Sequence, residues 1–193
     1  AAGGMLTVSS IRSSYGAPVY RGSIELALYD EGIVMINELP VEQYLYSVVP
    51  SEMPSEYGME PLKAQAVCAR GYAYMQINNC KLGYIGAHVD DSTAYQVYNN
   101  TRETDMSVSA VDATNGQVLQ YDGKIISPYY FSTSCGSTAD CSDVWIGMKH
   151  VPYLSGGIQN GEHPDIDLSG EDGIREFINN PPCDTYDSSF PWY

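Results

Sequence analysis

The chain has 193 residues, enough for one domain with a sizeable core, or for such a domain with a small appended lobe. It carries 24 acidic and 9 basic residues, and its net charge of −15 argues against a nucleic-acid partner and against adhesion to anionic lipid. No run approaches the ~20 apolar residues that a membrane span needs. The 17 tyrosines suit the faces of a neutral sugar and equally suit ordinary half-buried packing.

The first elements that the sequence predicts are a β-hairpin and a short helix. Residues 23–29, SIELALY, alternate in polarity, and a DEG turn leads into GIVMINEL. Pro40 then opens a helix through VEQYLYSVV, which we expect to end at Pro50 because proline interrupts the helical hydrogen bonds. Glu52 therefore falls in an apolar, proline-bounded turn.

The next element is a long helix that reaches about Asn78 and has almost no solvent-facing charge. One stripe is apolar and the opposite side is also apolar or small, which predicts a helix buried all round. Lys63, Gln65 and Arg70 would then be partly removed from water and would need a protein or ligand partner. Lys63 and Arg70, seven positions apart, project from the same side, and a carboxylate or a polar substrate is the natural partner there.

The rest of the chain predicts shorter elements. The fold class is α+β, with antiparallel hairpins packed on a central buried helix, because strands gather in hairpins instead of alternating with crossover helices. The predicted elements are a strand at 94–98 (AYQVY), a helix at 101–114, a hairpin around Asp122-Gly123, and a helical piece, DGIREFIN, in an acidic tail at 155–187.

A long motif resembles a known family. The segment VVPSEMP, followed by EPLKAQAVCARGYAY, resembles the signature of the SpoIID family, the stage II sporulation protein D and amidase-enhancer-like domains. The resemblance continues through NELPVEQYLYSVVPSEM, DDSTAYQVYN, ATNGQVLQYDG and YYFSTSCGSTADCSDVW. It implies one SpoIID-like domain over residues 1–193, with both ends truncated. It also implies the activity of the sporulation-type members, lytic transglycosylases that cleave peptidoglycan strands lacking stem peptides.

The resemblance places the catalytic acid at Glu52 and carries the family's helix lysine and arginine to Lys63 and Arg70. A lytic transglycosylase needs one acid, which protonates the bridging oxygen and then takes the proton of the muramyl C6 hydroxyl as it closes onto C1. Glu52 must then be protonated, so we expect Lys63 and Arg70 to hold sugar groups at a few ångströms' remove. The structural alternative makes Glu52 the buried ion-pair partner of one of these cations.

Other substrate contacts are expected in two segments. Gln96 and Tyr98 match a QVY element of the family, and alternation places them on one face for hydrogen bonding and stacking on sugar, or for core packing. Ser132, Ser134 and Gly136 form a small polar loop where relatives have a histidine-serine-glycine element, although Phe131 replaces the histidine in this chain.

Five cysteines cannot all pair within the chain, and two of them, Cys135 and Cys141, bracket a loop of small residues. That spacing allows a shared zinc ion, a disulfide or two free thiols. Some relatives bind zinc here with a histidine just before the second cysteine, where this chain has Asp140. Zinc would therefore need Asp140 as an oxygen ligand, or His88 or His150 from elsewhere. The chemistry itself requires no cofactor.

Two functions remain open at this level. The first is a glycan-strand lyase that releases 1,6-anhydro-muramyl products, and the second is a non-catalytic glycan-binding module that stimulates a cell-wall amidase. Either would act outside the cytoplasmic membrane, so we expect a secreted protein, or one anchored through a segment that precedes residue 1. The partners would be glycan strands and, in the second case, an amidase.

Overall fold

The computed structural model describes residues 4–12, 15–30, 32–92, 94–100, 102–134, 136–159, 167, 170–180, 184–186 and 188–189. The chain forms two compact units, residues 1–128 and residues 129–193, and each is described by itself. Helices and small antiparallel hairpins are mixed in both the sequence and the fold, so the α+β class is confirmed.

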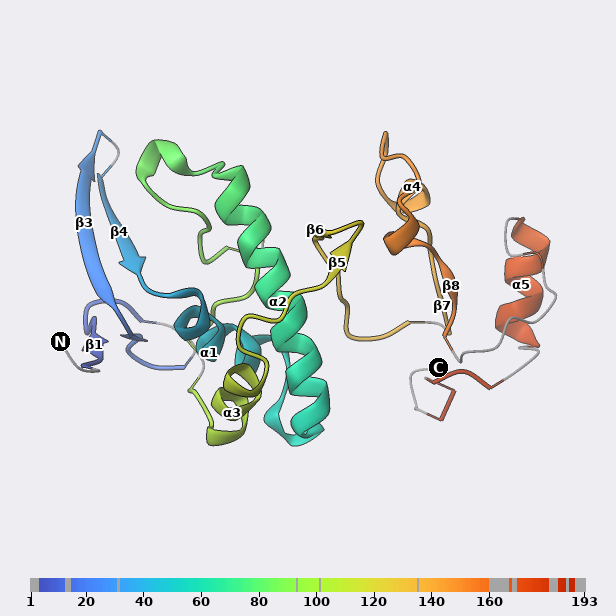
Figure 1. The fold of residues 1–193 in the computed structure, drawn as a ribbon, viewed down its shortest axis with the longest axis horizontal. Coiled ribbons are helices and arrows are strands. Elements are labelled where there is room, and N and C mark those ends of the chain that lie inside the picture. Colours follow the sequence, from blue (N-terminus) through green and yellow to red (C-terminus); the bar gives the residue numbers. More distant parts are fainter. Residues whose placement is uncertain are drawn as a thin grey trace. The chain divides into compact units, whose positions relative to one another are not determined.

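Figure 1 labels the elements in chain order. The strands are β1 (Leu6–Thr7), β2 (Val19–Tyr20), β3 (Ser23–Tyr29), β4 (Gly32–Glu38), β5 (Gln120–Tyr121), β6 (Lys124–Ile125), β7 (Ser137–Thr138) and β8 (Gly157–Ile158). The α-helices are α1 (Val41–Glu52), α2 (Met59–Asn79), α3 (Asp105–Ala113), α4 (Cys141–Val144) and α5 (Glu171–Asn179), and the short 3₁₀ turns are η1 (Ser55–Tyr57), η2 (Gly83–Ile85) and η3 (Pro152–Leu154). None of the described helices is long and apolar enough to cross a membrane.

The core of the first unit lies between α1, α2 and α3. Helix α2 packs against the other two and also contacts β6 (Figure 1), so it occupies the central position that the sequence predicted. Burial of aliphatic side chains from all three helices supplies most of the driving force for this arrangement. The fully buried cluster consists of Leu45, Val48, Val49, Leu62, Ala66, Ala69, Ala110 and Val111.

Both predicted hairpins of the first unit are present. β3 and β4 pair over their whole length, from Ser23 opposite Glu38 to Tyr29 opposite Gly32. β5 and β6 pair around Asp122 and Gly123, which have φ angles of 48° and 72°. Positive φ at both central residues matches the twist of a two-residue hairpin, which is why an Asp-Gly pair stands there.

Three local expectations were wrong. Helix α1 does not end at Pro50 but continues for two more residues, so Glu52 is helical and does not lie in a turn. Helix α2 is buried on one broad face only, since Ala64 and its neighbours at the first turn are exposed. Residues 94–98 form no strand, since the N–H groups of Ala94 and Tyr95 bond to Ser92 and that of Val97 bonds to Glu52 of α1.

The second unit is small and held by short elements. β7 pairs with β8 through Ser137 opposite Ile158 and Thr138 opposite Gly157, and the predicted helical piece of the tail is α5. Gly136 precedes β7 with a φ of 91°, and a Cβ there would lie 2.8 Å from the side chain of Thr185. Only glycine fits this position.

Candidate active site

The Glu52 carboxylate is half-buried at the last residue of α1. Its Oε1 atom accepts a hydrogen bond from the backbone N–H of Val97 at 2.9 Å. Met53 ends the helix in extended conformation, with its N–H donating to the carbonyl of Val49. Two features therefore determine the position of the carboxylate. One is the helix that carries Glu52, and the other is the Val97 N–H, 45 residues further along the chain.

Residues 96–99, which we call the strap, run along α1 and contact it from Tyr44 to Glu52. The N–H of Asn99 donates to Ser51 Oγ at 3.2 Å, and Ser51 Oγ in turn donates to the carbonyl of Ser47 at 2.6 Å. Two backbone N–H groups of the strap, at positions 97 and 99, thus point at α1. The strap overlaps residues 94–98, the segment that the sequence assigned to a strand, and it is bonded to the end of α1.

Side chains of the strap pack inward against Tyr44 of α1. Gln96 is only 4% exposed and accepts from the Tyr44 hydroxyl at 3.3 Å. Tyr98 stacks on Tyr44, with ring centroids 5.5 Å apart and planes 6° from parallel. Burial raises the pKa of the Tyr98 phenol, which keeps it protonated. The packing alternative for Gln96 and Tyr98, which the sequence left open beside sugar binding, describes these positions.

Arg70 lies inside the fold, whereas the sequence predicted that it faces the substrate. Its side chain is fully buried and forms a bidentate ion pair with Glu42 at 2.8 and 2.7 Å. The Nη1 and Nη2 atoms of the guanidinium also donate to the carbonyls of Gln117 at 2.9 Å and of Val111 at 3.3 Å, respectively. A guanidinium enclosed in this way joins α1, α2, α3 and the segment before β5, and it has no surface from which to reach a sugar.

Lys63 and Gln65 occupy different environments on α2. Lys63 is partly exposed and pairs with Glu60 one turn earlier at 2.7 Å. Gln65 is 7% exposed, and its Nε2 finds no hydrogen-bond partner among the described residues. Within the described part of the chain the carboxylate partners of Lys63 and Arg70 are Glu60 and Glu42, so neither cation is an ion-pair partner of Glu52.

Sequence reasoning missed two groups of the site. Glu42, in the first turn of α1, is the partner of Arg70, and no sequence pattern indicated this pairing. The Val97 N–H was missed because a backbone group leaves no mark in a side-chain pattern. The only signal available was that Val97 is the central residue of the QVY element.

The polar loop at residues 132–136 belongs to the second unit. Ser134 Oγ accepts from the N–H of Gly136 at 3.1 Å, and Ser132 is exposed. Phe131, at the position of the relatives' histidine, is 63% exposed. These contacts are internal to the loop, and its proposed role in substrate binding stays a prediction.

Asp140 and Cys141 begin helix α4 in the same unit. Asp140 caps the helix by accepting from the Ser142 N–H at 2.9 Å and the Ser142 hydroxyl at 2.7 Å, and its other oxygen lies 2.6 Å from His150 Nδ1. The Ser142 N–H, followed by its hydroxyl and by His150, lowers the pKa of Asp140 to about 2. The carboxylate therefore stays ionised at any physiological pH.

Cys141 is buried, forms no disulfide with a described residue, and donates its thiol to the Lys149 carbonyl at 3.5 Å. Cys135 lies outside the described residues, so the predicted link between the two cysteines also lies outside them. Among the residues that are described, no group of three or more His, Cys, Asp or Glu side chains could hold a metal ion. The zinc prediction with Asp140 as a ligand is therefore neither supported nor contradicted.

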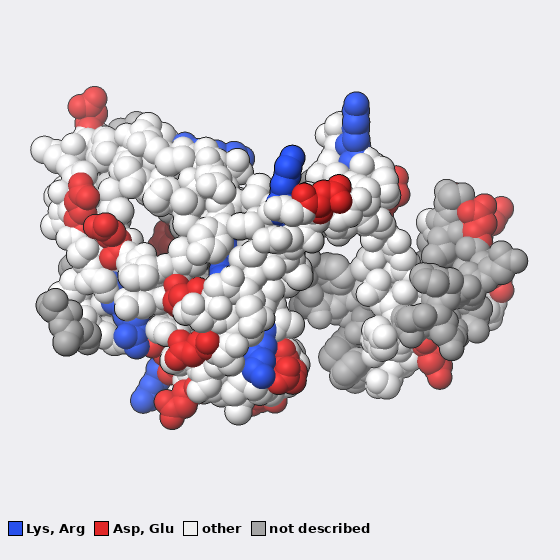
Figure 2. Space-filling view, viewed as in Figure 1, with Lys and Arg blue, Asp and Glu red and all other residues white. Residues whose placement is uncertain are grey.

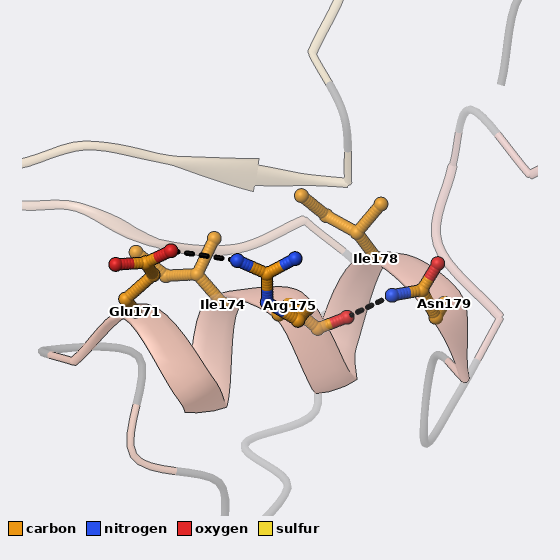
Figure 3. A pocket seen from close by; sticks show the side chains of 5 residues that line it. All are labelled: Glu171, Ile174, Arg175, Ile178 and Asn179. Carbon is orange, nitrogen blue, oxygen red and sulfur yellow. Dashed lines mark hydrogen bonds and ion pairs between the residues drawn. The ribbon is translucent and has the colours of Figure 1, made fainter.

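Two surface features complete the description. Figure 2 shows acidic side chains scattered over the visible face with Lys and Arg between them, and no large basic patch there. A pocket of about 280 Å³ lies beside α5. Figure 3 shows the side chains that line it, those of Glu171, Ile174, Arg175, Ile178 and Asn179. Arg175 and Glu171 pair across one helical turn at 2.6 Å, so the charges of this pocket are mutually satisfied.

Comparison with known proteins finds a family model and several relatives that match this chain. The family model named SpoIID, stage II sporulation protein, matches residues 29–121. A stage II sporulation protein D from Bacillus amyloliquefaciens is 32% identical over 167 residues, 78% of this chain and 48% of the relative. An amidase enhancer from Bacillus subtilis strain 168 is 38% identical over 110 residues, 57% of this chain and 14% of the relative.

A third relative, an uncharacterised protein from Brachyspira hyodysenteriae, is 42% identical over 140 residues, 71% of this chain and 37% of the relative. The chain thus spans less than half the length of each curated relative. The matched segment of the family model contains α1, α2, α3 and the strap, and it stops before the cysteine loop.

Proposed function

Because the chain belongs to the SpoIID family through residues 29–121, we propose that it is a lytic transglycosylase of peptidoglycan strands that lack stem peptides. The observation that carries the proposal is the Glu52 carboxylate, half-buried at the end of α1 and oriented by the Val97 N–H. A single oriented carboxyl group is what this reaction needs, whereas ordinary glycoside hydrolysis uses two.

In this mechanism Glu52 begins protonated and donates its proton to the bridging oxygen between two sugars. The C1–oxygen bond breaks and its electron pair stays with the departing oxygen. The C6 hydroxyl oxygen of the same muramyl residue then bonds to C1, and its proton returns to Glu52. No water is consumed, so the product carries a 1,6-anhydro ring and the enzyme is regenerated.

Substrate contacts are proposed for the remaining polar positions. Lys63 presents a partly exposed ammonium, and Gln65 has an amide nitrogen without a partner among the described residues. We assign both to the sugar N-acetyl or lactyl groups. As a separate proposal within the second unit, Ser132, Ser134 and Gly136 also bind glycan. Arg70 is left out because its donors are already used inside the fold.

Substitution of Glu52 tests the proposal. Pure protein should release 1,6-anhydro-muramyl products from purified denuded glycan, detected by mass spectrometry, and Glu52→Gln should slow release by at least ~10²-fold. Glu56→Gln is the matched control, because Glu56 is an exposed carboxylate one turn away and should keep its rate. An active, folded Glu52→Gln protein would remove the assignment.

The second candidate is a glycan-binding module that stimulates an amidase, and it is favoured by the name of the amidase enhancer among the relatives. In that case glycan strands would bind without new anhydro ends, and a cell-wall amidase would work faster when the protein is added. The same digest therefore distinguishes the two. Both functions place the protein outside the cytoplasmic membrane, which is part of the proposal.

The cysteine loop is proposed to be cross-linked, by zinc or by a disulfide, and to support the fold without entering the reaction. The proposal rests on the spacing of Cys135 and Cys141, which bracket a loop of small residues and could meet on one ion or on each other. Elemental analysis and a thiol count on native protein identify the link. Metal-free protein with both thiols reduced would contradict it, and a chelator or reductant should lower stability if it exists.

A further inference from the structure

The contact between Val97 and Glu52 is one of several contacts that join the strap to α1. The strap lies along one side of α1 and touches it at four successive levels, through Tyr44, Ser47, Ser51 and Glu52. These positions are three, four and one apart, which keeps them on neighbouring parts of the same helical surface. The segment is therefore docked on α1 along its length, and the end of this docking is the Val97 N–H on the carboxylate.

We propose that the strap is a positioning element for the acid, and that it holds the Glu52 carboxyl group through the Val97 N–H. This inference rests on the proposed function of Glu52. Oε1 accepts from the Val97 N–H at 2.9 Å, so the carboxyl group is tied to the strap at the end of α1.

The consequence for the reaction is geometric. Glu52 gives its proton to the bridging oxygen and takes the C6 proton back, while Oε1 keeps its bond to the Val97 N–H. The hydrogen bond strengthens as Glu52 becomes anionic, because a charged acceptor binds an N–H more strongly than a neutral one. It therefore favours the charge that develops on the enzyme as the proton leaves.

Gln96 and Tyr98 hold the strap in place from the other side. Their contacts with Tyr44 anchor the residues on both sides of Val97 to the middle of α1. We assign them the role of positioning residues that act through Val97. The assignment explains why polar and aromatic side chains next to the acid are directed inward.

The test replaces the peptide N–H of Val97 with an ester oxygen, by incorporating the α-hydroxy acid that corresponds to valine. The side chain and the chain path are retained and only the donor is lost. We expect kcat for release of anhydro products to fall by roughly 10- to 100-fold with little change in KM, as expected for a lost hydrogen bond to a charged group. The matched control is the same ester at Ile126, whose N–H donates to the Leu119 carbonyl away from the strap and which should keep its kcat.

A second measurement does not depend on activity. In amide hydrogen exchange the Val97 N–H should lose protection in Glu52→Ala, while the Asn99 N–H, bound to Ser51, keeps its own. An ester variant with unchanged kcat, or a Val97 amide that is indifferent to Glu52→Ala, would overturn the positioning role. If Glu52→Gln keeps wild-type activity while Val97 still responds to Glu52→Ala, the lyase assignment has failed and the contact between strap and carboxylate remains.

Discussion

At the scale of single residues, Arg70 illustrates how burial decides the role of a charge. The same motif that places a glutamate at position 52 places this arginine 18 positions later, and the sequence alone suggested that both face the substrate. The guanidinium instead satisfies Glu42 and carbonyl groups from α3 and from the segment before β5. A buried charge must find its partners within the fold, because an unpaired one is too costly.

Arg70→Ala should therefore destabilise the protein, by roughly 3–5 kcal/mol, since it leaves Glu42 and two carbonyls without their donor. Urea denaturation followed by circular dichroism measures the loss. Lys63→Ala is the control, because its partly exposed pair with Glu60 should contribute no more than about 1 kcal/mol. If Arg70→Ala kept its stability but lost glycan cleavage, a direct substrate contact would have to be reconsidered.

At the scale of elements, helix α1 shows why a proline need not end a helix. Pro50 lies two positions before the last residue of α1, so it removes only one donor from the last turns. The carbonyl of Ser47 is bonded by the Ser51 hydroxyl, and the strap covers the same end through Asn99. The helix therefore continues long enough to carry Glu52 to the Val97 N–H.

Helix α2 provides an element-scale prediction at Gly71. A Cβ at this position would lie 3.1 Å from the Ile126 carbonyl oxygen and 3.2 Å from Pro128 Cδ, so the glycine permits close approach of the chain after β6. Gly71→Ala should lower stability by roughly 1 kcal/mol or more, because crowding against the backbone exceeds the gain of about 1 kcal/mol in helix propensity.

Urea denaturation followed by circular dichroism measures the stability of Gly71→Ala. Ala64→Gly, at an exposed position of α2, isolates the propensity contribution and should cost about 1 kcal/mol. A Gly71→Ala protein more stable than wild type would mean that residues 126–128 do not approach α2 this closely.

At the scale of the whole molecule, the two units differ in how they are stabilised. The first unit contains the aliphatic cluster of three helices, the Arg70 network and the acid with its strap. The described part of the second unit contains short elements with few buried side chains, of which Phe177 and Cys141 are the largest hydrophobic ones. Independent stability should therefore reside in residues 1–128.

A fragment of residues 1–128 should consequently fold alone, with helical circular dichroism and a cooperative urea transition. The shorter fragment 1–113 serves as the comparison, since it keeps all three helices but lacks the Gln117 carbonyl that accepts from Arg70 and the chain that packs on Gly71. It should unfold at lower urea. A 1–128 fragment without a cooperative transition would show that the second unit is needed for folding.

Local sequence patterns were sufficient to predict several features of the fold and of the candidate site. The alternation of β3, the Asp122-Gly123 turn, the span of α2 and the motif with Glu52 all depend on residues close together in the chain, so the sequence determined the α+β class and the candidate acid. The extent of α1 past Pro50, the pairing of Arg70 with Glu42 and the bond from Val97 to Glu52 were decided only by tertiary structure. The contacts of Arg70 with Glu42 and of Val97 with Glu52 join residues 28 and 45 positions apart, and the end of α1 depends on such distant contacts as well. No local periodicity encodes which distant group will satisfy a buried charge or a helix end.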